Sequence, residues 1–210
     1  MTRSAFLLAL FLPVVLCIQC SASVLVTSLS QSGIAQGSEF GNLLQDQFSN
    51  NSLPPVSDVA AIPFYPVSHQ QTVNSYATTA NSLALDLQLV SEVTPGLLDF
   101  PQAFGNFSLS FTLSTAAALT YTANAGGPNE YVSLQKDGND VFSINDASGS
   151  DVLYIGPGNY LLSLSSFADD GPYSYTGSGI DLFLEASPIP EPATCTLALI
   201  GLCLASKRRR

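Results

Sequence analysis

Apolar residues alternate with polar ones at a period of two through much of the chain, and this pattern constrains the fold more than any other feature. From Ser82 to Val90 the alternate positions are all Leu, and from Phe107 to Leu113 Phe and Leu alternate with Ser and Thr. A period of two places apolar side chains on one face of a strand, whereas on a helix it would spread them around the whole surface. Both segments are therefore predicted to be half-buried β-strands.

Turn-forming residues predict further strands. Two segments rich in Gly, Asn and Asp, at 137–140 and 156–159, separate short apolar runs. Since Gly and Asn tolerate positive φ, both are predicted to be β-hairpin turns. The strands that they join would be Tyr131–Lys136 with Val141–Ile144, and Val152–Ile155 with Tyr160–Ser165, while Leu119–Ala123 and Ile180–Glu185 are two more predicted strands.

The N-terminal part of the domain shows no clear alternation. Residues 24–58 are rich in Ser, Gln, Asn and Gly, and Leu53-Pro54-Pro55 breaks any regular element, so we expect one or two strands and long loops there. Strands at spacings of about ten residues predict an all-β fold, an antiparallel β-sandwich or jelly roll. This domain would span residues 24–186, flanked by an N-terminal signal helix and a short C-terminal transmembrane helix.

Positive charge is nearly absent from the central domain. Of the six Lys and Arg residues, one lies near the start, four close the chain, and only Lys136 lies between. The span from Val24 to Pro190 carries 15 acidic residues against this one Lys, a net charge of −14. Binding to nucleic-acid phosphates needs clustered Lys and Arg, so nucleic acid is excluded as a partner. All four cysteines also lie in the terminal segments, so no disulfide framework is predicted.

The N-terminus has the pattern of a secretory signal peptide over residues 1–23. Arg3 precedes an apolar run from Ala5 to Ile18, and small residues follow, which fits cleavage after Ala22 or Ser23. A lipoprotein signal is the alternative that we disfavour, because Leu and Gln precede the two cysteines of this segment, where a small residue would be needed. The chain is therefore expected to be exported.

The C-terminal segment, residues 187–210, contains a proline-rich part, an apolar part and a basic part in that order. The prolines keep the first part extended. A helix over residues 193–205 would be about 20 Å long, which is shorter than the ~30 Å hydrocarbon core of a bilayer. Lys207, Arg208, Arg209 and Arg210 favour the cytoplasmic side of the membrane. The tail is predicted to be a weak membrane anchor with the domain outside.

This tail resembles the PEP-CTERM sorting signal. Pro190, Glu191 and Pro192, a short apolar helix and a terminal basic cluster occur in the order typical of that family. Its members are substrates of exosortase-type membrane enzymes in bacteria that export polysaccharide. The resemblance implies transient anchoring in the inner membrane, processing by an exosortase, and attachment or release of the domain at the cell surface or in extracellular matrix. An ordinary C-terminal anchor is the alternative.

Few residues of the domain suggest catalysis. The only histidine, His69, is predicted to lie in an exposed loop, with neither a Gly-x-Ser-x-Gly elbow nor a domain cysteine to accompany it. No catalytic residue is assigned. Aromatic side chains could stack on sugars, although strand-edge packing is the more common role; the candidates are Tyr131, Tyr154, Tyr160, Tyr173 and Tyr175.

Calcium is the one metal hypothesis, and no other cofactor is expected. Asp137, Asn139, Asp140, Asp146 and Asp151 fall close together in predicted loops, and Ca²⁺ prefers several oxygen ligands. Their spacing differs from that of an EF-hand, so a solvated acidic loop is the competing interpretation.

Together these observations predict a non-enzymatic, exported cell-surface or matrix protein of a bacterium, associated with exopolysaccharide. The alternatives are a secreted, lectin-like carbohydrate-binding module that uses calcium, and a carbohydrate-active hydrolase.

Overall fold

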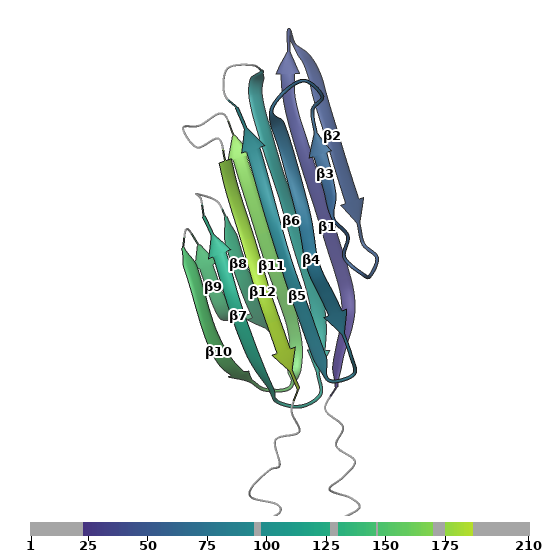
Figure 1. The fold of residues 1–210 in the computed structure, drawn as a ribbon, viewed down its shortest axis with the longest axis vertical. Helices are drawn as coiled ribbons and strands as arrows, with labels where there is room; N and C mark the ends of the chain where they lie inside the picture. Colours follow the sequence, from purple (N-terminus) through teal and green to yellow (C-terminus); the bar gives the residue numbers. More distant parts are fainter. Residues whose placement is uncertain (1–22, 95–97, 127–129, 146, 170–174, 187–210) are drawn as a thin grey trace, which may run out of the picture.

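The computed structural model describes residues 23–94, 98–126, 130–145, 147–169 and 175–186, and every regular element in these ranges is a β-strand (Figure 1). The strands form two six-stranded antiparallel sheets. Sheet A contains, in order, β2 (Asn42–Asn50), β1 (Val24–Glu39), β6 (Asp99–Leu113), β11 (Gly158–Asp169), β8 (Tyr131–Lys136) and β9 (Asn139–Asn145). Sheet B contains β10 (Ser148–Ile155), β7 (Ala117–Ala125), β12 (Tyr175–Glu185), β5 (Ser82–Val93), β4 (Val67–Thr78) and β3 (Asp58–Ala61). The predicted all-β class is confirmed.

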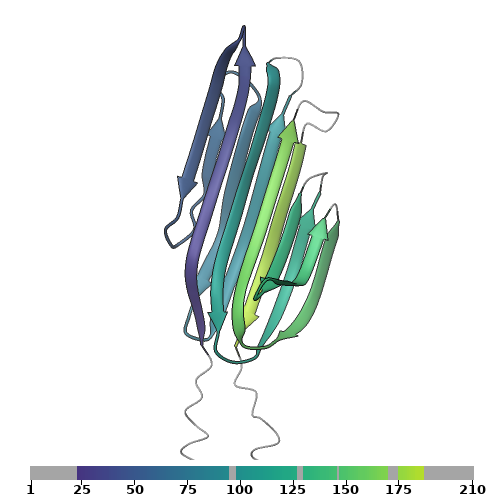
Figure 2. The same ribbon diagram turned by 180° about the vertical axis from the view of Figure 1, so that it is seen from behind.

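The two sheets lie face to face and share one large apolar core (Figures 1 and 2). The alternating leucines of β5 enter this core from sheet B, and Phe107, Leu109 and Phe111 of β6 enter it from sheet A. The two-sheet arrangement is the one expected of an antiparallel sandwich. The jelly-roll alternative stays a prediction, and the signal helix and transmembrane helix lie outside the described residues.

The N-terminal part contains much more strand than predicted. β1 and β2 are joined by a turn of only two residues, Phe40 and Gly41, and together they replace the long loops expected from the composition. The alternation was hidden because the inward-facing side chains at this end of β1 are small: Gly33, Ala35 and Gly37 are all buried. A strand that packs small residues against its partner sheet carries little hydrophobic signal.

One of the two predicted hairpins is confirmed and the other is wrong. β8 pairs with β9 through a two-residue turn, in which Asp137 and Gly138 have φ of 49° and 82°. β10 and β11 are both present, but β10 lies at an edge of sheet B while β11 lies inside sheet A. The segment at 156–157 therefore crosses between the sheets. Turn composition predicts a change of direction but does not specify which neighbour a strand will pair with.

The described domain begins and ends at the same end of the molecule, which we call the tether end. Backbone N–H groups of Val24 and Ala186 donate to the carbonyls of the neighbouring residues Ala80 and Asn81, each at 2.8 Å. The β1–β2 turn lies at the opposite end, which we call the far end (Figure 1). No helix able to cross a bilayer occurs in the part of the chain that the structure describes.

Candidate functional site

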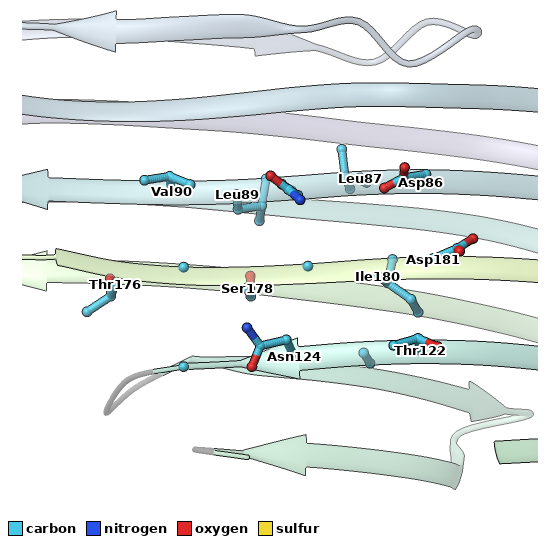
Figure 3. A pocket seen from close by; sticks show the side chains of 15 residues that line it. Asp86, Leu87, Leu89, Val90, Thr122, Asn124, Thr176, Ser178, Ile180 and Asp181 are labelled. Atoms are coloured by element: carbon cyan, nitrogen blue, oxygen red, sulfur yellow. The ribbon is translucent and has the colours of Figure 1, made fainter. Parts of the chain in front are cut away.

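An open groove of about 420 Å³ lies on the outer face of sheet B, above β12 (Figure 3). Gly177 and Gly179 form its floor. Because they are two residues apart in a strand, both face the same side of the sheet. Gly179 lies between Gln88 of β5 and Asn124 of β7. Because these two residues have no side chains, the surface over β12 is lower than the surface over β5 and β7 on either side. This difference in height forms the groove.

Polar side chains line the two sides and one end of the groove. Asp86 of β5 and Asp181 of β12 are directly paired, with Thr122 of β7 next in the same row. Figure 3 shows the two carboxylates side by side at one end of the groove. The carboxylate of Asp86 accepts a hydrogen bond from the side-chain amide of Asn74 at 3.0 Å. Within the described residues, no protein group bonds to the side chains of Gln88, Asn124 or Asp181, so these are available to a ligand.

The same outer face becomes apolar toward the tether end. Phe183 follows Asp181 on this side of β12, is 47% exposed, and has the short side chains of Ala84 and Thr120 as its cross-strand neighbours. Tyr154 of the edge strand β10 is 81% exposed on the same face. The groove therefore continues into a surface that carries exposed aromatic rings.

His69 is buried, which corrects the prediction of an exposed loop histidine. It lies in β4 with no exposed surface, and its ring fills the space above two glycines of sheet A. A Cβ at Gly105 would come to 1.9 Å from Nε2 of His69, and one at Gly33 to 2.4 Å from Cδ2. Phe48 stacks on the imidazole, with ring centroids 5.9 Å apart. The absence of side chains at the two glycines makes room for the ring.

The hydrogen bonds of His69 link both sheets. Its Nδ1 lies 2.9 Å from the hydroxyl of Ser91, which lies 2.9 Å from the hydroxyl of Ser166 in β11. Nε2 has no hydrogen-bond partner in the described structure. Burial lowers the pKa of His69 from 6.5 to about 4, because the charged imidazolium would lose its hydration. His69 and Ser91 are the residue types of a catalytic Ser–His dyad, but both are sealed from solvent. Their burial favours a structural role.

The proposed calcium ligands do not converge in the described structure. Asp137 accepts from the backbone N–H of Asn159 at 3.3 Å, Asp140 accepts from Gln135 at 2.9 Å, and Asp151 accepts from its neighbour Val152. Asn139 donates weakly to the carbonyl of Asp137, and Asp146 lies outside the described residues. No group of three or more His, Cys, Asp or Glu side chains suited to a metal occurs within the described ranges. Calcium binding stays a prediction without structural support.

The candidate tyrosines have different environments. Tyr160 is buried, stacks on Phe111 at 5.2 Å, and donates its hydroxyl to the carbonyl of Gly156 at 2.6 Å. This burial raises its pKa. Tyr131 is partly exposed, and Tyr154 is the candidate most open to solvent. The side chains of Tyr173 and Tyr175 lie outside the described part.

The groove was not predicted from the sequence. The signal that could have revealed it is the Gly177-Ser178-Gly179 repeat directly before the predicted strand Ile180–Glu185, since glycine inside a strand marks a bulge or a close approach by another group. Most of the predicted terminal sites lie outside the described residues: Ala22, Pro190, Glu191, Pro192 and Lys207 to Arg210. Ser23, by contrast, packs at the tether end, where its hydroxyl bonds to Ser114.

Comparison with known proteins identifies the tail. Residues 188–210 match the family model of the PEP-CTERM protein-sorting motif. The prediction that the chain carries the C-terminal tail of an exosortase substrate is confirmed. Such a tail implies export to the cell surface or envelope. A search among curated proteins finds no match to the chain.

Proposed function

We propose that this chain, which carries the PEP-CTERM tail of an exosortase substrate, is a non-enzymatic surface module associated with exopolysaccharide. In this proposal the signal peptide directs export, the tail anchors the protein briefly in the inner membrane, and the processed domain is attached or released at the cell surface or in matrix. The observation that carries the proposal is the match of residues 188–210 to the sorting motif.

The architecture of the domain supports this role. The tail follows β12, whose last residue, Glu185, lies at the tether end of the domain. Strand β1 runs from this end to the far end, and its 16 residues give a length of about 50 Å. A protein held by its tail would therefore hold the outer faces of both sheets away from the membrane.

A hydrolase is the second candidate, because Asp86 and Asp181 are cross-strand neighbours in the groove. Glycosidases use two carboxyl groups, one of which must hold a proton as general acid. Asp181 is exposed on an open sheet face that does not exclude water. These features favour binding over bond cleavage.

Mass spectrometry of the protein from cells and from medium tests the sorting step. We expect the wild type to lose the apolar and basic parts of the tail, and a variant with alanine at Pro190, Glu191 and Pro192 to retain Lys207 to Arg210. Pro188→Ala is the matched control, since it changes the same proline-rich segment outside the three-residue motif. Identical masses and identical fractionation for the wild type and the triple variant would refute the proposal.

The hydrolase alternative is tested separately by incubating the protein with neutral polysaccharides and measuring new reducing ends. We expect none above the background of Asp181→Asn. A release of reducing ends by the wild type that Asp181→Asn abolishes would show that the domain is an enzyme.

A further inference from the structure

We infer that the outer face of sheet B binds a neutral polysaccharide chain, laid along β12 from the glycine floor of the groove to Phe183. The inference rests on the proposed association with polysaccharide, but it does not depend on cleavage of the tail. It assigns that association to one face of the domain and to one class of polymer.

The shape of the face suits an extended ligand. Gly177, Gly179, Asp181 and Phe183 all face outward from β12, and this row is about 20 Å long. No described element lies over this face in Figure 1. A closed pocket would suit a small molecule, whereas an uncovered groove along a strand can accept the internal units of a polymer.

The polar groups of the groove suit sugar hydroxyls. The amides of Gln88 and Asn124 face each other across Gly179, and within the described residues neither is bonded to another protein group. On the outer face of sheet A, by comparison, the amide of Gln36 donates to Gln102 and that of Gln135 donates to Asp140, each at 2.9 Å, so these two are already bonded within the protein. A side-chain amide both donates and accepts, as a hydroxyl does. Gln88 and Asn124 thus present two unbonded amides to a ligand, one on each side of Gly179.

The aromatic residues supply the apolar part of the contact. The C–H groups on the faces of a sugar ring are apolar and pack against exposed aromatic rings. Phe183 continues the row of the groove, and the short neighbours Ala84 and Thr120 leave it accessible. Tyr154 extends this surface toward the edge strand. A polymer bonded in the groove would reach Phe183 without changing direction, and Tyr154 lies to one side of that path.

Charge selects a neutral polymer over an anionic one. Four carboxylates lie on this face, those of Asp86, Glu92, Asp181 and Glu185, and the strands of sheet B contain no Lys or Arg. Their summed field repels polyanions. The carboxylates can still accept hydrogen bonds from neutral sugar hydroxyls.

The inference is tested with the full chain in a non-sugar detergent, by electrophoresis in native gels that contain a polysaccharide. Retention is measured as slower migration of the protein than in a gel without the polysaccharide. Three neutral polymers, hydroxyethyl cellulose, a β-1,3-glucan and a mannan, are compared with polygalacturonate, an anionic polymer. We expect retention by at least one neutral polymer, none by polygalacturonate, and no loss of retention in raised salt. Phe183→Ser is expected to weaken binding about tenfold, and a Gln88→Ala, Asn124→Ala double variant by a similar factor.

Phe100→Ser is the matched control, because Phe100 is an exposed phenylalanine at the start of β6, outside sheet B. Urea unfolding of each variant separates loss of binding from loss of folding, and the double variant keeps the test valid if Phe183→Ser does not fold. Retention by none of the neutral polymers overturns the inference. The inference is also overturned if the groove variants fold and are retained as strongly as the wild type. It is likewise overturned if raised salt abolishes retention. Binding without tail cleavage would refute only the sorting proposal.

Discussion

The two halves of the domain have different interiors. The half nearer the tether end has a core of leucine and phenylalanine from both sheets. The half nearer the far end has a smaller core that contains four alanines, Ala35, Ala60, Ala103 and Ala168. Between them lies the polar layer of His69, Ser91 and Ser166. Large apolar side chains stabilise one half through burial, whereas the other relies on strand pairing and close approach of small residues.

The largest expected effect separates the two cores. Phe107→Ala should lower the free energy of unfolding by about 4 kcal/mol, because it leaves a cavity where a fully buried ring had been. Val93→Ala, in the smaller core near the far end, should lower the free energy of unfolding by only about 2 kcal/mol, because fewer buried atoms are lost. Urea unfolding monitored by near-UV circular dichroism measures both. Equal losses would show that the two halves do not differ in this way.

The polar layer between the halves should make stability depend on pH. The folded state lowers the pKa of His69 from 6.5 to about 4, so between these values the unfolded chain binds more protons. Stability is therefore fully present above about pH 7, falls as pH decreases from 6.5 to 4, and loses at most about 3 kcal/mol. Urea unfolding from pH 4 to 8, with the His69→Gln variant as control, isolates this contribution. The same slope in both proteins would contradict it.

The glycines that face His69 should be intolerant of any side chain. Gly105→Ala should cost about 2 kcal/mol, because its Cβ would overlap the imidazole. Gly156→Ala is the control, since a Cβ there meets only the end of the flexible Lys136 side chain, at 3.4 Å. The sharper measurement is the double variant of Gly105→Ala with His69→Ala, in which most of the glycine effect should disappear. Strict additivity would show that the ring and the glycine do not interact.

The smallest effect is expected at the far end. Phe40 occupies a turn position with φ of 50°, a conformation that a bulky residue adopts at a cost. Phe40→Asn should raise the free energy of unfolding by about 0.5–1 kcal/mol, because Asn tolerates this region better. Leu43→Asn, also exposed but in strand β2, should give no such gain. A rise in the thermal midpoint for both variants would show that the gain comes from replacing an exposed apolar side chain and not from the turn conformation.

The difference between the two cores also explains which strands could be predicted from the sequence. β5, β6 and β12 were recognised because their inward positions carry leucine and phenylalanine. The far parts of β1 and β4 were missed because their inward positions carry Gly33, Ala35, His69 and other small or polar residues. Those residues are buried only because the opposite sheet lies close enough to cover them. The candidate groove was missed for a related reason, since its floor is made of residues that have no side chain.

The sequence by itself determined the all-β class, the anionic character of the domain and the sorting tail. Each of these depends on a local pattern: a period of two, a charge count, or a contiguous motif. Only the tertiary structure decided which strands pair, and it placed β10 and β11 in different sheets. It also buried His69 above two glycines and aligned Gln88, Gly179 and Asn124 in one row. A local turn pattern can predict the pairing within a hairpin, as it did for β8 and β9, but pairing between strands far apart in the chain depends on contacts that no local pattern specifies.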